Sequence, residues 1–334
     1  MEGSFVVFRP DVHFLQVEGS GCNMWRKMNL GRFVTSILPM ALVVGLSGCI
    51  TRTVVKSDSQ LQCAPGTAHH FDRVLIVVLE SQNYETAVKD STLSALAQQG
   101  TSFRDFDALF HPSYPNYLAM IGGKEFEMNE LNGDDQVDFP DDSQHRTIAD
   151  LMTENGLHWK NYVEDYPGSQ FLGAKAGRFV RRHAPFLSFA KNKPEYFANV
   201  VSVDPADPNN RFVSDVKSHS LPEYSFYTPN LVNGRRSSNL KTGLSAWLKD
   251  FLDNKFPPSA RAGTLTVITF DESQGKEKTN QIYTVFLGDM VQANNTLSQN
   301  YNHYNVLRTV EDNFGLVPLS YGDFHAAPIM GIWK

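Results

Sequence analysis

Apolar runs alternate with amphipathic segments through most of this chain. Runs rich in β-branched and aromatic residues predict strands, at residues 73–79, 102–109, 158–163, 223–228, 264–270 and 281–287. A helical spacing of apolar residues predicts helices, at residues 91–99, 118–121, 147–155, 242–254 and 304–314. Because strands alternate with helices, we expect an α/β fold: a central, mostly parallel sheet with helices on both faces.

Two longer segments lack a regular pattern. Residues 133–143 are acidic and rich in turn-forming residues, which predicts a surface loop. Residues 166–212 contain scattered glycines, prolines and basic side chains. We expect this second segment to be an excursion that passes over the functional face of the sheet.

The N-terminal part of the chain has the pattern of a signal peptide. Basic residues around Arg26 precede an apolar run at 33–44, which is shorter than the roughly 20 residues of a transmembrane helix. Leu46 to Cys49 then match the lipobox of bacterial lipoproteins. We therefore expect lipidation of Cys49, a membrane partner reached through that lipid, and a place on the periplasmic side of the cell envelope.

These features divide the chain into three parts. We expect residues 1–49 to form the signal peptide, residues 50–70 a flexible tether, and residues 71–334 one catalytic domain. Residues 1–23 have no signal character, which favours a translation start at Met24 or Met28. The 30 basic and 36 acidic side chains give a formal net charge of −6, and we predict no nucleic-acid partner, since such binding needs a basic surface.

Acidic residues follow two of the predicted strands. The strand at 264–270 ends on Asp271 and Glu272, and the strand at 73–79 ends on Glu80. The carboxyl ends of strands form the ligand-binding edge of an α/β sheet. Neighbouring carboxylates repel each other unless a proton or a cation lies between them. The sequence therefore predicts a metal site at this edge.

A serine precedes the second predicted helix in a turn flanked by prolines. The hydroxyl of Ser113 would lie close to backbone amides and to the positive end of that helix, where phosphate groups bind readily. A hydroxyl beside a bound cation can lose its proton and attack an electrophile. This chemistry favours phosphoryl transfer with Ser113 as the nucleophile, and His303 begins another helix as a second candidate.

Several ordered blocks carry a family resemblance. The segments 111–119, 266–272 and 301–315 resemble the bacterial acid phosphatase and phospholipase C phosphoesterase family, which belongs to the alkaline phosphatase superfamily. Three intermediate blocks, 159–167, 182–186 and 224–231, are similar to that family in the same order. The resemblance covers roughly residues 71–329 and implies an alkaline-phosphatase-like sheet between helices.

The resemblance also implies site residues. It assigns the nucleophile to Ser113, and it assigns the ligands of a divalent cation to Glu80, Ser113, Asp271 and Glu272. Asn116 would donate to a phosphate oxygen. His303 matches a ligand of a second metal in relatives that bind two, and it could also contact phosphate, act as a general acid or be structural.

This chain departs from the family pattern at two places. Ser81 stands where relatives have an asparagine after the first acid, and its hydroxyl would replace that phosphate donor in part. The segment 229–237 lacks the Asp and His that help to hold a second metal. We expect one metal, with Arg235 or Arg236 supplying charge to the substrate, although both arginines could equally lie on a surface loop.

Two other histidines have open roles. His183 follows arginines in a family block and is a candidate phosphate ligand or a structural residue. His111 precedes Pro112, and we expect it to orient the nucleophile turn.

The sequence thus predicts a metal-dependent acid phosphatase that hydrolyses phosphate monoesters through a phosphoserine. One alternative is a phospholipase C or a phosphoinositide phosphatase, which would act on lipids with the same chemistry. Another is an inactive, lipid-anchored binding protein. The mostly oxygen ligands favour Mg, Ca or Mn, whereas His303 would favour Zn.

Overall fold

The computed structural model describes residues 69–128, 137–234, 243–275 and 279–334. The described residues all belong to one compact unit. Within the described ranges, no helix has the length and apolar character needed to cross a bilayer. The predicted signal peptide, its Cys49 and nearly all of the predicted tether lie outside the described residues.

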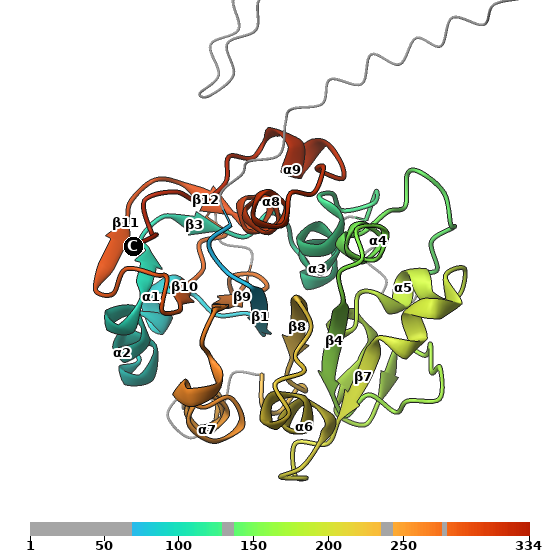
Figure 1. The fold of residues 1–334 in the computed structure, drawn as a ribbon, viewed down its shortest axis with the longest axis horizontal. Coiled ribbons are helices and arrows are strands. Elements are labelled where there is room, and N and C mark those ends of the chain that lie inside the picture. The colour runs from blue at the N-terminus through green and yellow to red at the C-terminus, as the bar shows by residue number, and fades with distance from the viewer. Residues whose placement is uncertain (1–68, 129–136, 235–242, 276–278) are drawn as a thin grey trace, which may run out of the picture. The chain divides into compact units, whose positions relative to one another are not determined.

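An eight-stranded sheet forms the centre of the fold (Figure 1). Its strands follow the order β11 (Asn295–Leu297), β2 (Thr101–Phe103), β10 (Thr284–Leu287), β9 (Thr264–Phe270), β1 (Arg73–Leu79), β8 (Tyr224–Thr228), β4 (Trp159–Glu164) and β7 (Val200–Val203). Strand β10 runs antiparallel to both of its neighbours, and the other pairs are parallel. The predicted mostly parallel sheet is confirmed.

Helices cover both faces of this sheet. Figure 1 shows α3, α4 and α8 on one side and α6 and α7 on the other. The helices are α1 (Tyr84–Ala87), α2 (Ser91–Gln99), α3 (Ser113–Gly122), α4 (Ile148–Glu154), α5 (Leu187–Ala190), α6 (Arg211–Lys217), α7 (Leu244–Asp250), α8 (His303–Phe314) and α9 (Tyr321–His325). Shorter helical turns lie at Arg181–His183, Pro194–Ala198, Phe251–Lys255 and Pro258–Ala260.

The central strands are apolar because both of their faces are covered. All seven residues of β9 are buried, and β1 is buried after its first residue. Continuous β-branched runs of this kind are typical of parallel strands between two helical layers. The core sits on these strands, which hold the acidic residues at their carboxyl ends.

Capping residues fix the ends of the helices that matter for the site. The side chain of Asn302 accepts a hydrogen bond from the backbone of Tyr304 and starts α8. Helix α3 ends at Gly123, whose φ of +66° favours glycine. A Cβ at Gly123 would lie 2.0 Å from Asp323 Oδ1, so the start of α9 packs directly on the end of α3.

Part of the sequence prediction is wrong. The segment 166–212 is more than an excursion, because it contributes β7 to the main sheet and the start of α6. The expectation that it reaches the functional face holds for Arg182 and His183, which contact Glu80. The predicted strand at 102–109 is divided, because β2 joins the main sheet whereas β3 (Phe106–Asp107) pairs with β12 (Tyr301–Asn302). A further small sheet pairs β5 (Lys175–Ala176) with β6 (Phe179–Val180).

The domain also begins earlier than predicted. The backbone N–H of His70 donates to Asn313 Oδ1 at 2.7 Å, and its ring stacks on Trp333 at 4.3 Å. His69 and His70 were expected in the tether. Their contacts place them on the domain instead.

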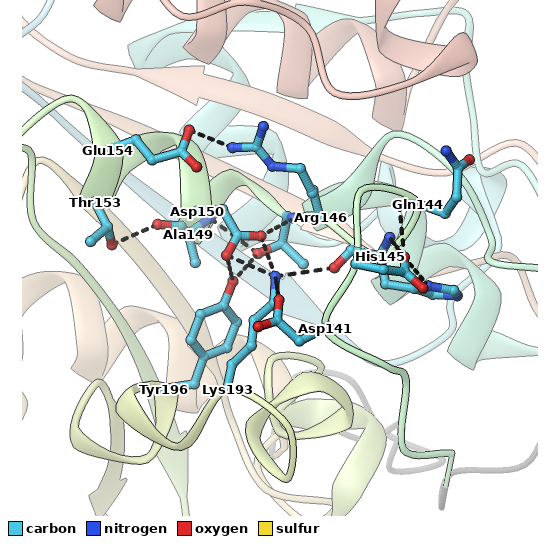
Figure 2. Close-up of polar contacts among 12 residues, drawn as sticks. Asp141, Gln144, His145, Arg146, Ala149, Asp150, Thr153, Glu154, Lys193 and Tyr196 are labelled. Atoms are coloured by element: carbon cyan, nitrogen blue, oxygen red, sulfur yellow. Dashed lines mark hydrogen bonds and ion pairs between the residues drawn. The ribbon is translucent and has the colours of Figure 1, made fainter.

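A buried polar cluster fixes the start of α4 (Figure 2). Lys193 Nζ donates to both carboxylate oxygens of Asp150 at 2.8 Å. Tyr196 donates to Asp150 Oδ1 at 2.7 Å, and Thr147 caps the helix. The cluster joins the helix to the segment that leads into β7.

Candidate active site

Two of the predicted acids meet because their strands are neighbours. Strands β1 and β9 run parallel with Leu79 opposite Phe270, so the residues that follow, Glu80 and Asp271, leave the same edge of the sheet. The backbone N–H of Asp271 donates to the carbonyl of Leu79 at 2.9 Å, which continues the pairing to this point. The register of the sheet therefore brings the acids together.

Ser113 is the first residue of α3, and it faces the third acid. Its hydroxyl donates a hydrogen bond of 2.8 Å to Glu272 Oε1, and the residue is only 8% exposed. The first backbone amides of a helix have no partner inside the helix and carry a partial positive charge. The Ser113 hydroxyl thus lies beside a proton acceptor, Glu272, and at a helix N-terminus that favours anions.

The carboxylate of Glu272 has two further neighbours. The Nδ1–H of His111 donates to Glu272 Oε2 at 2.6 Å, which leaves Oε1 turned toward Ser113. The hydroxyl of Ser81 lies 3.4 Å from the same Oε1. His111 was expected to orient the turn that carries Ser113, and here it holds the carboxylate that the Ser113 hydroxyl contacts.

Cationic and imidazole groups surround Glu80. The Nε2–H of His183 donates to Glu80 Oε1 at 2.5 Å, and a guanidinium nitrogen of Arg182 lies 3.2 Å from the same oxygen. Burial raises the pKa of Glu80, but the hydrogen bonds and charges of His183 and Arg182 outweigh it and lower the pKa to about 2. Glu80 is therefore ionised throughout the physiological range.

Asp271 has the opposite environment. It is fully buried, its Oδ1 accepts from the backbone N–H of Glu272 at 2.8 Å, and its Oδ2 has no hydrogen-bond partner in the part of the chain that the structure describes. Burial, followed by the charges of Glu80 and Glu272, raises the pKa of Asp271 well above its usual value. An unpartnered buried acceptor calls for a proton, a water or a cation.

The donor set fits a hard cation in its chemistry. Asp271 Oδ2 is the buried acceptor without a partner, and the other nearby ligand types are carboxylate and hydroxyl oxygens, which Mg²⁺, Ca²⁺ and Mn²⁺ prefer. Among the described residues, however, no group of three or more His, Cys, Asp or Glu side chains is already arranged to hold a metal. The hydrogen bonds to Glu80 and Glu272 account for this, because His111, Ser113, His183 and Arg182 occupy oxygens of these two acids.

Asn116 has a different task from the one expected. Its Oδ1 accepts from the backbone N–H groups of Leu109 and Phe110 at 2.9 and 3.0 Å, and its Nδ2 donates to the carbonyl of Phe110 at 2.7 Å. The side chain of Asn280 donates to the same carbonyl at 2.8 Å. The two asparagines build the turn that presents Ser113, and donation from Asn116 to phosphate stays a prediction.

His303 is likewise tied to the backbone. Its Nε2–H donates to the carbonyl of Asp271 at 3.1 Å, and its ring packs edge-on against Phe106. Burial lowers the pKa of His303 to about 4, so the imidazole is neutral near pH 7. This geometry supports the carbonyl of a site residue, and a catalytic role for His303 stays a prediction.

Two predicted substrate residues, Arg235 and Arg236, lie outside the described residues. The preceding residue, Gly234, accepts a hydrogen bond of 3.2 Å from the backbone N–H of Glu80. The loop before the arginines therefore contacts the site.

Two residues of the site escaped the sequence analysis. Asn280 carries no local signal, since its role depends on the fold of distant segments. Tyr117 lies four residues after Ser113, a spacing that puts both on one face of a helix. That spacing could have identified it.

Comparisons with known proteins agree with this geometry. The Phosphoesterase family profile matches residues 80–317. A probable acid phosphatase of Kluyveromyces lactis is 33% identical over 269 residues, which cover 76% of this chain and 60% of the yeast protein. A phosphatidylinositol-3-phosphatase of Mycobacterium tuberculosis is 28% identical over 312 residues, which cover 91% of this chain and 97% of that protein.

The fold has relatives among solved structures. A Vibrio parahaemolyticus protein of the alkaline phosphatase superfamily aligns with a TM-score of 0.53 at 15% identity, covering 79% of this chain and 71% of that one. The chain spans 57–61% of the length of the fungal acid phosphatases that it resembles. The family match covers residues 80–317, a range that includes Glu80, Ser113, Asp271 and Glu272, and this chain therefore belongs to the Phosphoesterase family.

Proposed function

We propose that this protein hydrolyses phosphate monoesters with Ser113 as the nucleophile. The observation that carries the proposal is the 2.8 Å hydrogen bond from the Ser113 hydroxyl to Glu272 Oε1, at the start of α3 and beside two more carboxylates. The fungal acid phosphatases and the mycobacterial phosphatase support a phosphoric ester as the substrate class.

The proposed reaction consists of two successive displacements at phosphorus. Ser113 Oγ attacks phosphorus while its proton passes to Glu272, and the bond from phosphorus to the leaving oxygen breaks as that oxygen takes a proton from solvent. Water then attacks the phosphorus of the phosphoserine and gives up one proton to solvent. The bond from phosphorus to Ser113 Oγ breaks, and Ser113 Oγ takes back the proton held by Glu272. The amides at the start of α3 favour the negative charge of the phosphate throughout.

We further propose that Glu80, Asp271, Glu272 and Ser113 hold one divalent cation, of which Mg, Ca, Mn and Zn are the candidates. The buried, unpartnered Oδ2 of Asp271 supports this assignment. A divalent cation bound in such a site polarises a phosphoryl oxygen and lowers the pKa of a neighbouring hydroxyl. His111 would then fix the orientation of Glu272, and His183 with Arg182 that of Glu80.

The metal assignment has a direct test. Asp271→Asn should abolish the binding of a divalent cation, measured as metal content per chain by mass spectrometry and as thermal stabilisation by each added ion. Asp289→Asn, an exposed aspartate, serves as the control. Equal metal content in both variants would rule out Asp271 as a ligand.

The nucleophile is tested by its own substitution. Ser113→Ala should lower the hydrolysis of nitrophenyl phosphate by on the order of 10³-fold or more, because no other hydroxyl would carry the phosphoryl group. Ser245→Ala, a buried serine in α7, should keep the wild-type rate. Wild-type turnover by Ser113→Ala would refute the proposal, and a wild-type chain without any hydrolysis would favour the inactive, lipid-anchored binding protein.

A second candidate substrate is a phosphoinositide. The observation in its favour is the alignment with the mycobacterial phosphatidylinositol-3-phosphatase, which covers 91% of this chain and 97% of that protein. Comparing the kcat/KM for nitrophenyl phosphate with that for short-chain phosphatidylinositol 3-phosphate separates the two. Release of phosphocholine from phosphatidylcholine would instead indicate a phospholipase C.

A further inference from the structure

Tyr117 carries a buried hydroxyl that the reaction described above does not use. The residue lies on α3, four positions after Ser113, and its side chain is 0% exposed. Side chains of a helix lean toward its N-terminus, so the phenol of Tyr117 leans toward the turn that carries Ser113. Its ring centroid lies 5.7 Å from that of His183, the partner of Glu80.

The charged groups of the site surround this phenol. Asp271, Glu80, Glu272 and Arg182 all act on it electrostatically, with Asp271 the strongest. Burial, followed by these negative charges, raises the pKa of Tyr117 well above its usual value, so the hydroxyl keeps its proton. The phenol is therefore available as a hydrogen-bond donor near neutral pH.

The hydroxyl nevertheless bonds none of these acids. Within the described part of the chain, Tyr117 OH has no hydrogen-bond partner, and neither has Asp271 Oδ2. The nearby oxygens of Glu80 and Glu272 accept from His183 and His111 instead. A buried donor without a partner is costly, and in native proteins such a group is satisfied by water or by a ligand.

We infer that Tyr117 is a further catalytic residue, whose phenolic O–H donates a hydrogen bond to a nonbridging oxygen of the phosphate group bound at Ser113. This inference rests on the proposed phosphatase function and adds a specific donor to it. A tetrahedral oxyanion brings several acceptor oxygens into the site, and a donor fixed in place by packing needs no rearrangement to meet one of them.

The test removes one oxygen atom. Tyr117→Phe should raise the inhibition constant of inorganic phosphate and lower kcat/KM for nitrophenyl phosphate, each by about 10- to 100-fold, as expected for a lost hydrogen bond to a charged group. The melting temperature should stay the same or rise slightly, because the lost hydroxyl has no protein partner in the described residues.

The chain offers a matched control in Tyr224. This tyrosine is also 0% exposed with an unpartnered hydroxyl among the described residues, but it begins β8, at the opposite end of the strand from the site. Tyr224→Phe should leave phosphate inhibition and kcat/KM unchanged.

Other outcomes overturn the inference. Wild-type phosphate inhibition and kinetics in Tyr117→Phe would mean that the hydroxyl does not touch the substrate. A marked loss of thermal stability in that variant would give the hydroxyl a structural partner instead. If the wild-type chain itself neither hydrolyses nitrophenyl phosphate nor binds phosphate, the proposed function fails first, and this inference fails with it.

Discussion

The three acids of the site differ because each has different neighbours. Glu80 is held by His183 and Arg182, and its pKa is lowered to about 2, although burial acts in the other direction. Burial, followed by the like charges of Glu80 and Glu272, raises the pKa of Asp271, and the weaker effects of Ser113 and Arg182 do not offset this. Pairs of carboxyl groups whose environments separate their pKa values are a common feature of catalytic sites. Here the difference leaves Asp271 as the acid that most needs a counter-charge.

Another buried carboxyl lies away from the site. Glu311 of α8 is 0% exposed, no donor group among the described residues bonds its carboxylate oxygens, and its side chain meets another carboxyl, that of Asp323. Burial, followed by the carboxyl of Asp323 on α9, raises its pKa well above the usual value. The charges of Arg308 and Asp312 on α8 affect Glu311 more weakly. The phenol of Tyr224 on β8 also interacts electrostatically with Glu311.

This carboxyl predicts a pH dependence of stability. Because the pKa of Glu311 is higher in the folded state than in the unfolded chain, the stability that it contributes is present below about pH 4.3 and is lost as the pH rises through the folded pKa. Glu311→Gln should therefore raise the melting temperature by an amount that grows with pH. Thermal unfolding followed by circular dichroism from about pH 4 to pH 9 measures it.

The control for this prediction is the same substitution at an exposed site. Glu85→Gln, on α1, should shift the melting temperature little and equally at every pH. A gain in Glu311→Gln that does not change with pH would contradict the explanation.

At the scale of elements, continuous apolar runs were predicted best. The bounds of β1, β9 and α2 agree with the sequence prediction at both ends, because buried parallel strands and a helix between Asp90 and Gly100 leave clear signals. Strand β7 was missed because it is short and lies between prolines, at 194 on one side and at 205 and 208 on the other. Helix α3 begins at Ser113 rather than near Leu118, since a proline in the first turn needs no donor and does not prevent a helix.

The buried cluster at the start of α4 supplies a prediction about stability. Lys193 is 5% exposed and its ammonium group is held by Asp150, so Lys193→Met leaves a carboxylate buried without its partner. The free energy of unfolding should fall by about 3 kcal/mol. Urea unfolding measures this value.

A neighbouring lysine provides the comparison. Lys191 pairs with Asp138 but is 61% exposed, so Lys191→Met should cost less than about 1 kcal/mol. If the two substitutions lowered the free energy of unfolding equally, the cluster in Figure 2 would stabilise the fold no more than an exposed ion pair does.

At the scale of the whole molecule, the site combines segments that are far apart in the sequence. The residues of the serine motif and the acids at strand ends were predicted because each lies within a recognisable local pattern. The pairs His183–Glu80 and His111–Glu272 span 103 and 161 residues, and only the folded sheet brings them together. Local sequence patterns therefore identified the acids and the serine of the site, but they did not show which histidine would pair with which acid.

We also propose that the chain is anchored in the bacterial cell envelope on the periplasmic side through Cys49. This proposal is supported by the order of features in residues 26–49, where basic residues are followed by an apolar run and then by a lipobox. Cys49→Ser should abolish incorporation of a labelled fatty acid and release the protein from the membrane fraction, whereas Cys63→Ser should change neither. Labelling that persists in Cys49→Ser would contradict the anchor.

The central claim is that Ser113 carries the phosphoryl group during turnover. The most direct measurement is an acid quench of the enzyme during hydrolysis of nitrophenyl phosphate, followed by peptide mass spectrometry. We predict a mass increase of one phosphoryl group on the peptide that contains Ser113, and none in Ser113→Ala. Rapid turnover with an unmodified Ser113 peptide, or phosphate on any other residue, would contradict the account.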